Sequence, residues 1–387
     1  MSEPLDKVAD RGYNNATDPQ ALDELRAYVV SLRETARLHP LLATALFSLL
    51  NLAAIAMVPL PSVTKAIPFA GGEGTHSVLS ILNGAHSIGE GILGFFTMVE
   101  SNALRGVCKE FRKALMDFPW MDAESIIRGS LMAWRAAFPA ARAVNVTEGY
   151  VGRRKPIVDE DFVHIRGDAR ARLHTVDMRE CIRVTDAAFV HLRGIQSLNM
   201  VYCNPSTITD AAFVHLRGIH ILDMSKCNQA TITDAAFMNL HGIHTIGMGG
   251  CNQATITDAA FVHLRGIHTF SMSNCKQITD AAFVHLRGIL KLEMESCFRI
   301  TDAAFVHLRG IQKLNMAGCN QMTITDAAFV HLHGIHTLDM SRCNQATITD
   351  AAFVHLRGIR VFTTYDCRPA VRTAAAAVLS LGLACCD

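Results

Sequence analysis

A short phrase that returns at fixed spacing constrains this chain more than any other feature of its sequence. The run Thr-Asp-Ala-Ala-Phe occurs eight times, and successive aspartates stand 22 or 24 residues apart. A second run recurs with the same spacing, and in most copies it reads Ile-x-x-Leu-x-Met-x-x-Cys. One unit of this length cannot bury an apolar face by itself, but stacked copies can, so the pattern predicts a solenoid. The recurring residues are Asp186, Asp210, Asp234, Asp258, Asp280, Asp302, Asp326 and Asp350, and Cys181, Cys203, Cys227, Cys251, Cys275, Cys297, Cys319, Cys343 and Cys367.

Each unit is predicted to contain a very short strand followed by a short helix. Leu198 and Met200 alternate with their neighbours at period two, which is typical of a strand with one buried face. Thr209 is a predicted N-cap, because its hydroxyl can accept a hydrogen bond from an otherwise unpaired backbone N–H. Asp210 follows in the first turn, where the helix dipole favours negative charge.

The same helix has a predicted inner side and a predicted end. Phe213 and Leu216, three positions apart, form an apolar stripe that must face the core. Gly218 stands where a residue with positive φ usually ends a helix. Stacked units therefore predict an α/β solenoid, with a parallel β-sheet on its concave side and short helices on its convex side.

These motifs resemble the cysteine-containing leucine-rich repeat of F-box proteins, whose units carry Cys-x-x-Ile-Thr-Asp, as at 275–280. The resemblance covers more than half of the chain. The departures are a slightly short unit and methionine where leucine is usual in the strand. It implies a leucine-rich-repeat solenoid preceded by a small all-α region. The nearly identical copies are also similar to repeat families expanded in protists and their giant DNA viruses.

The stretch 103–112 resembles the latter half of an F-box. An F-box normally opens with Leu-Pro, and here Asn83-Gly84 occupies that place. The resemblance implies that these helices dock on the small adaptor subunit of a cullin–RING ubiquitin ligase; the alternative is a helical cap for the first repeat. The adaptor-binding residues that it implies are Ile88, Ile92, Phe95, Leu104, Val107, Cys108 and Phe111.

Residues 41–60 contain no charged side chain and are long enough to cross a bilayer. Asn51 within the run, and Pro59 and Pro61 at its end, favour a buried or partner-facing helix, with a membrane span as the alternative. The N-terminus has no basic start followed by an apolar core, so we expect no secretory signal, a cytoplasmic location and reduced thiols. The alternative is a membrane-associated or virion location.

No catalytic, cofactor-binding or metal-binding group of residues is predicted. The cysteine column is expected to pack as small buried hydrophobes, with oxidation or metal binding as the alternative. The histidine before each inward leucine is expected to be half-exposed. A formal net charge of +1 argues against a nucleic-acid partner, because phosphate binding needs a basic excess. We therefore expect protein partners and no enzymatic activity.

The concave face is where the sequence predicts target binding, and the alternative is a soluble inner sheet without a dedicated ligand. Strand residues such as Asp177 are expected to point outward on this face. The patch around residues 291–295 differs most from the other repeats and is the favoured source of specificity. The predicted target-binding residues are Tyr202, Lys226, Lys291, Glu293, Glu295, Lys313, Asn315 and Arg342.

The predicted organisation has five parts. It supports a substrate receptor of a ubiquitin ligase, with a structural or scaffold protein of a particle or membrane assembly as the alternative. The parts are a lead with a short helix (1–40), an apolar helix and linker (41–75), an F-box-like helical region that ends in a lead-in strand near 143–146 (76–146), the solenoid of about nine repeats (147–367), and a cap helix with a tail (368–387).

Overall fold

The computed structural model describes residues 98, 113, 115–127, 129–148, 156–166 and 172–383. The chain divides into two units, Met1–Phe118 and Pro119–Asp387, and nearly all described residues belong to the second. The apolar run 41–60 and all the predicted adaptor-binding residues lie outside the described residues. Within the described ranges, no helix combines the length and hydropathy that crossing a bilayer requires.

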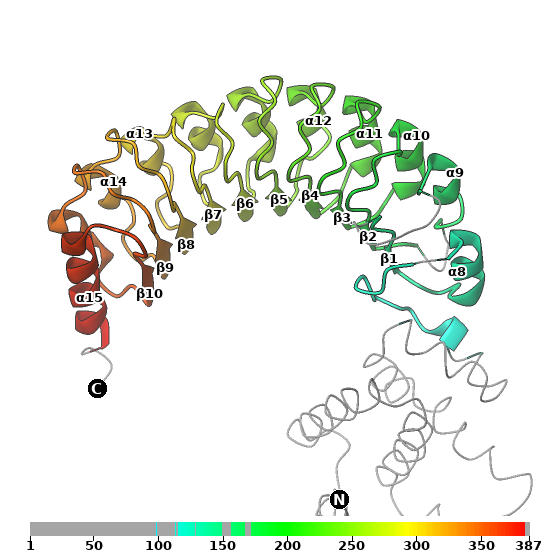
Figure 1. Cartoon of the computed structure of the whole chain (residues 1–387), viewed down its shortest axis with the longest axis horizontal. Helices are drawn as coiled ribbons and strands as arrows, with labels where there is room; N and C mark the ends of the chain where they lie inside the picture. Colours follow the sequence, from blue (N-terminus) through cyan, green and yellow to red (C-terminus); the bar gives the residue numbers. More distant parts are fainter. Residues whose placement is uncertain are drawn as a thin grey trace, which may run out of the picture. The chain divides into compact units, whose positions relative to one another are not determined.

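Ten short strands form one parallel sheet in which each strand pairs with its neighbours in sequence order (Figure 1). The strands line the inner edge of the arc of repeats, which confirms the predicted parallel sheet and the lead-in strand. Their bounds are β1 Ala143–Asn145, β2 Thr175–Asp177, β3 Ser197–Asn199, β4 Ile221–Asp223, β5 Thr245–Gly247, β6 Thr269–Ser271, β7 Lys291–Glu293, β8 Lys313–Asn315, β9 Thr337–Asp339 and β10 Val361–Thr363.

The helices are one or two turns long and lie on the outer edge of the arc (Figure 1). They are α8 Leu131–Ala137, α9 Asp159–Phe162, α10 Asp186–Phe189, η3 Val190–Leu192, α11 Asp210–Phe213, η4 Val214–Leu216, α12 Asp234–Phe237, η5 Asp258–Leu264, η6 Asp280–His285, α13 Asp302–Phe305, α14 Asp326–Phe329 and η7 Asp350–Leu356, where η marks 3₁₀ geometry. The longer helix α15, Pro369–Leu383, ends the described chain.

The ends of these short helices have the chemistry that the sequence predicts. Thr209 is the N-cap of α11, and its hydroxyl oxygen accepts a hydrogen bond from the Ala211 N–H at 3.1 Å. After η4 the chain turns at Gly218, whose φ is +81°. Both predictions are confirmed, and the same two features recur in the repeats from Thr185 onward, whereas the N-cap of α9 is Val158.

The core is a stack of similar layers. A typical repeat contributes its strand centre, methionine, cysteine, phenylalanine and leucine, as Leu198, Met200, Cys203, Phe213 and Leu216 do, and all five are at most 1% exposed. The cysteine and phenylalanine columns keep one residue type from repeat to repeat, whereas the strand centre varies among valine, leucine, isoleucine and phenylalanine. This arrangement explains why one repeat alone could not fold, since each layer is buried only by its neighbours.

A polar ladder also joins consecutive helix starts. Asp186 accepts two hydrogen bonds from Thr209 of the next repeat, from its N–H and from its hydroxyl, both at 2.7 Å. Because the acceptor is charged, these bonds are stronger than neutral ones. The equivalent pairs run from Asp159–Thr185 to Asp326–Thr349.

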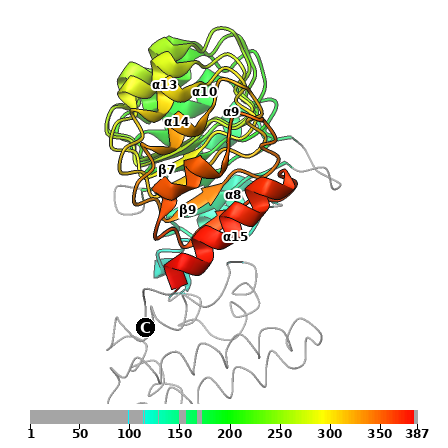
Figure 2. The ribbon, with the colours of Figure 1, turned by 90° about the vertical axis from the view of Figure 1, so that its left-hand side faces the viewer.

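The helix predicted after the last repeat is α15. It packs against η7 and touches β10, with Val371 and Ala375 buried. Figure 2 faces this end of the repeats and shows α15 in front of them. The helix therefore covers apolar surface that the last repeat would otherwise expose.

Candidate functional site: the concave face

The concave face is built by the first and third residues of each strand. In β3 the central Leu198 is buried, whereas Ser197 and Asn199 are half-buried on the opposite side. Because side chains alternate along a strand, all the first and third residues share one surface. Parallel pairing in register then aligns them in columns, for example Lys291 beside Lys313.

Variation among the repeats is concentrated on this face and in the turn after it. The helix start is Asp-Ala-Ala-Phe in eight repeats, but the first and third strand positions differ in size, charge and polarity. The first positions of β2–β10 are Thr175, Ser197, Ile221, Thr245, Thr269, Lys291, Lys313, Thr337 and Val361, and the third are Asp177, Asn199, Asp223, Gly247, Ser271, Glu293, Asn315, Asp339 and Thr363.

A charged patch occupies β7 and β8, where the sequence places the centre of specificity. The Lys291 ammonium lies 2.7 Å from a Glu293 carboxylate oxygen, and both side chains are partly exposed. Lys291 also stands in register with Lys313, and Glu293 with Asn315. Glu295 follows two residues later and is half-buried. Like charges on adjacent strands repel each other, and Lys291 and Lys313 form such a pair, while Glu293 offsets part of the charge of Lys291.

Three other predicted residues lie beyond the strands, which corrects the sequence-based placement. Tyr202, Lys226 and Arg342 each come directly before a buried cysteine, in a turn with φ between 61° and 62°. Their side chains are exposed, Tyr202 by 50%. The three residues occupy equivalent positions in their repeats, in a row beside the concave face, and not on the strands.

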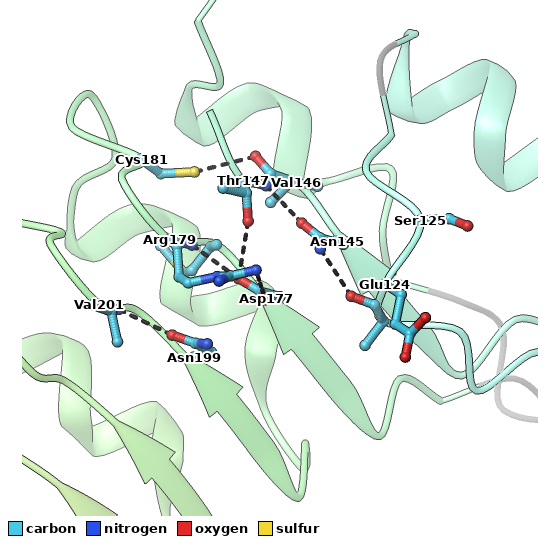
Figure 3. A network of polar contacts seen from close by, with 12 residues as sticks. Glu124, Ser125, Asn145, Val146, Thr147, Asp177, Arg179, Cys181, Asn199 and Val201 are labelled. Carbon is cyan, nitrogen blue, oxygen red and sulfur yellow. Dashed lines mark hydrogen bonds and ion pairs between the residues drawn. The ribbon is translucent and has the colours of Figure 1, made fainter. Parts of the chain in front are cut away.

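Asp177 was predicted to point outward, but it is only 7% exposed. Its carboxylate accepts hydrogen bonds from the Thr147 hydroxyl at 3.0 Å and from the Arg179 side chain, which also forms an ion pair with it at 2.9 Å (Figure 3). Nearby, the Asn145 amide donates to the Ala123 carbonyl at 2.8 Å. These contacts hold the first strands together, so Asp177 is a structural residue at the N-terminal end.

The cysteine column is buried and its nine thiols are free, as the sequence predicts. Each thiol donates to a backbone carbonyl near the end of the previous strand, as Cys203 does to Met178 at 3.0 Å. Burial raises the pKa of Cys203 to about 12 and that of Cys275 to about 11. The thiols therefore stay protonated and unreactive at neutral pH.

The histidine column lies on the convex side and forms contacts that the sequence did not reveal. His215 accepts a hydrogen bond from the Arg193 side chain of the previous repeat at 2.9 Å. Burial, followed by the charge of Arg193, lowers the pKa of His215. The signal was available, because His and Arg recur two residues apart in most repeats. In the described part of the chain, no three His, Cys, Asp or Glu side chains converge on a geometry that could hold a metal.

A match to a known repeat family agrees with the fold. A family model described as "BspA type Leucine rich repeat region" matches residues 172–289 in six copies. The glycosylated Toll–Spatzle complex of Drosophila is similar at 16% identity and a TM-score of 0.47, covering 66% of this chain and 34% of that one. The yeast Rad7–Elc1 complex is similar at 13% identity and 0.42, covering 78% and 97%. No curated protein matches.

This chain thus spans about a third of the length of the Toll chain that it matches. The repeats and the ten-stranded parallel sheet define its class as a leucine-rich-repeat solenoid. Such a solenoid is a protein–protein interaction module, of a kind that is typically non-catalytic. The match at 172–289 does not extend to the F-box-like segment, and the similarity to protist and viral repeat families stays a prediction.

Proposed function

We propose that this chain is a substrate receptor: its concave face binds a target protein and its F-box-like segment recruits the adaptor subunit of a cullin–RING ubiquitin ligase. The observation that carries the target-binding half is the distribution of differences among the repeats. The core and helix-start columns are repeated nearly without change, whereas the concave columns differ from strand to strand. A surface that served only as a spacer would have no need of this diversity.

The charged patch at 291–295 and 313 is the proposed centre of target recognition. Lys291 already pairs with Glu293, whereas no ion pair is formed by Lys313 within the described residues. An acidic group of the target can lie between the two lysines and relieve their repulsion. Asn315 beside Glu293 adds an amide that can donate or accept hydrogen bonds. We therefore propose a target segment with at least one carboxylate.

The row of Tyr202, Lys226 and Arg342 extends this surface beyond the strands. Tyrosine and arginine supply much of the binding energy in many protein interfaces. Their backbone turns tightly before a buried cysteine, which fixes where each side chain leaves the solenoid. The row is proposed as a set of anchors flanking the charged patch.

The adaptor-binding half rests on the sequence of residues 88–111 alone. Its proposed contacts are those of an F-box, with Leu104 and Val107 on the adaptor-facing side. Aspartate at both positions places charge in what is proposed to be an apolar interface, where an unpaired charge is costly.

The decisive experiment is a pull-down of the full chain from eukaryotic extract with two separated variants. Leu104→Asp with Val107→Asp is expected to lose the adaptor but keep the target. Lys291→Glu with Lys313→Glu is expected to lose the target but keep the adaptor. Arg265→Glu on the convex side is the matched control and is expected to keep both.

Two outcomes would count against the proposal. If the adaptor is never recovered, the chain is an interaction module outside a ubiquitin ligase, as a scaffold would be. If the lysine variant and the wild type recover the same proteins in the same amounts, the patch does not recognise the target. Circular dichroism of each variant shows whether it is folded. A loss of binding caused by unfolding is thereby distinguished from the loss of a contact residue.

A further inference from the structure

The two edge strands of the sheet, β1 and β10, differ in whether their outward backbone groups have hydrogen-bond partners. At the N-terminal edge, the Trp120 carbonyl accepts hydrogen bonds from the Arg142 and Ala143 N–H groups at 2.8 and 2.9 Å. The Ile127 N–H donates to the Asn145 carbonyl at 2.8 Å, and Ile126 forms a bridge with the same residue. The segment 120–127 thus acts as an additional strand, and the β1 edge is paired.

The C-terminal edge has no such segment among the described residues. In the previous repeat, the N–H groups of Met340 and Arg342 donate to the Thr363 and Tyr365 carbonyls of the next strand, at 3.0 and 2.7 Å. The equivalent donors of the last repeat are the N–H groups of Thr364 and Asp366, and the described part of the chain supplies no acceptor for either. Helix α15 packs against η7 and does not pair with this edge.

The last repeat also departs from the others at this edge. Residues 361–365 read Val-Phe-Thr-Thr-Tyr, where the previous repeat has Thr-Leu-Asp-Met-Ser. All five are residues that strands favour. Val361 and Tyr365 are 51% and 66% exposed. Soluble proteins usually protect an open edge with charge, proline or a covering segment, and this stretch has no charged residue or proline of its own.

We propose that β10 pairs with β10 of a second copy of the chain, antiparallel about a two-fold axis at Thr363. In this register, Phe362 lies opposite Thr364 of the second copy, and their backbone groups point toward the partner. Each Thr364 N–H donates to the Phe362 carbonyl across the axis, and each Phe362 N–H donates to the Thr364 carbonyl. The two ten-stranded sheets thereby become one continuous sheet.

The side chains of this register favour a second copy over an unrelated strand. Val361 lies opposite Tyr365, an aliphatic–aromatic pair on the concave side. Arg360 directly precedes β10, and Asp366 lies in the turn after it with φ 56°. The two-fold axis brings Arg360 of each copy to the end of the paired stretch where Asp366 of the other copy lies, so two opposite-charge contacts favour the second copy. Asp366 remains available, because its contact with Arg342 is 4.0 Å long and both side chains are more than half exposed.

The test is the mass of the full chain in solution, by sedimentation or light scattering across a range of concentrations. The wild type is expected to associate into dimers. Arg360→Asp is expected to weaken dimerisation by about tenfold or more, because it replaces two attractive pairs with two repulsive ones. Arg360→Asp combined with Asp366→Arg restores the pairing and is expected to recover the dimer. Arginine is tolerated at position 366, since Arg342 adopts φ 61° at the equivalent place.

A second variant tests the backbone pairing itself. Thr364→Pro removes an outward N–H and leaves the bonds between β9 and β10 in place, so it is expected to give a folded monomer. Arg265→Asp on the convex side is the matched control and is expected to leave the mass unchanged. The proposal is overturned if the wild type stays monomeric, or if Arg360→Asp and Thr364→Pro associate as the wild type does.

Discussion

At the scale of single residues, the turn glycines show how backbone conformation limits the repeat. Gly218 has φ +81°, and a Cβ added there would meet no atom within 4 Å. The cost of a side chain at this position is therefore conformational and not steric. We expect Gly218→Ala to lower the free energy of unfolding by about 1 to 2 kcal/mol, the cost of placing an L-residue in the left-handed region. Urea unfolding of the full chain measures it.

Gly129 is the matched control for this substitution. It also has open space around its missing Cβ, but its φ is not in the left-handed region. Gly129→Ala is expected to be neutral or slightly stabilising, since alanine restricts the unfolded chain. Equal effects at both glycines would show that backbone conformation is not what the turn requires.

At the scale of the element, each short helix is joined to its neighbour through its first turn. Asp258 accepts two hydrogen bonds from Thr279 of the next repeat, at 2.8 and 2.5 Å. Asp350 has the same place in η7, the helix of the last repeat, but the described residues offer it no threonine. Asp258→Ala is expected to cost about 2 kcal/mol more than Asp350→Ala, because hydrogen bonds to charged groups contribute about 1.5 to 3 kcal/mol.

Both aspartates lie in a first turn, so both variants lose the favourable interaction with the helix dipole. The difference between their unfolding free energies therefore isolates the contact with the next repeat. If the two substitutions cost the same in urea unfolding, the ladder contributes nothing beyond the local helix.

Features of these short helices could be predicted from the sequence where their physical cause lies within one repeat. The N-cap Thr209 and the turn at Gly218 follow from rules that act within one unit. The hydrogen bond of each aspartate reaches the following repeat, and a period alone does not show which side chains meet across it. Tyr202 was placed among the outward strand residues, but the strand ends at Asn199 and the backbone of Tyr202 turns with φ 61°. Glycine at the equivalent 250 and 318 was the available signal.

At the scale of the whole molecule, the repetition of the sequence made the fold predictable. The candidate site was less predictable. Near-identical units fix the core columns and the sheet order, because only in-register stacking buries every layer. The concave face depends on the residues that differ, and each has its own surroundings. Asp177 shows this: the strand pattern points it outward, yet Arg179 and Thr147 enclose it. The residue pattern that the repeats share cannot predict contacts that are formed in only one repeat.

The lowered pKa values of the convex histidines predict how the stability of the repeat array depends on pH. Burial is the main cause that lowers the pKa of His215, His263, His285 and His331, and the neighbouring Arg193, His241, Arg265 and Arg309, respectively, lower it further. The folded chain therefore binds fewer protons than the unfolded chain at these sites. Its stability is complete above the ordinary histidine pKa of about 6.5 and decreases as the pH falls below it.

Thermal unfolding at pH 7.5, 6.5 and 5.5 measures this effect, and the midpoint is expected to fall with pH. The repeat that contains α12 supplies the matched substitution, because Asn239 replaces histidine there and accepts the Arg217 hydrogen bond at 3.0 Å. We therefore replace the four histidines whose pKa is lowered with asparagine. Each substitution keeps a hydrogen-bond acceptor and removes the side chain that titrates. The variant is expected to lose less stability than the wild type between pH 7.5 and 5.5. An unchanged pH dependence would mean that these histidines titrate alike in the folded and unfolded chains.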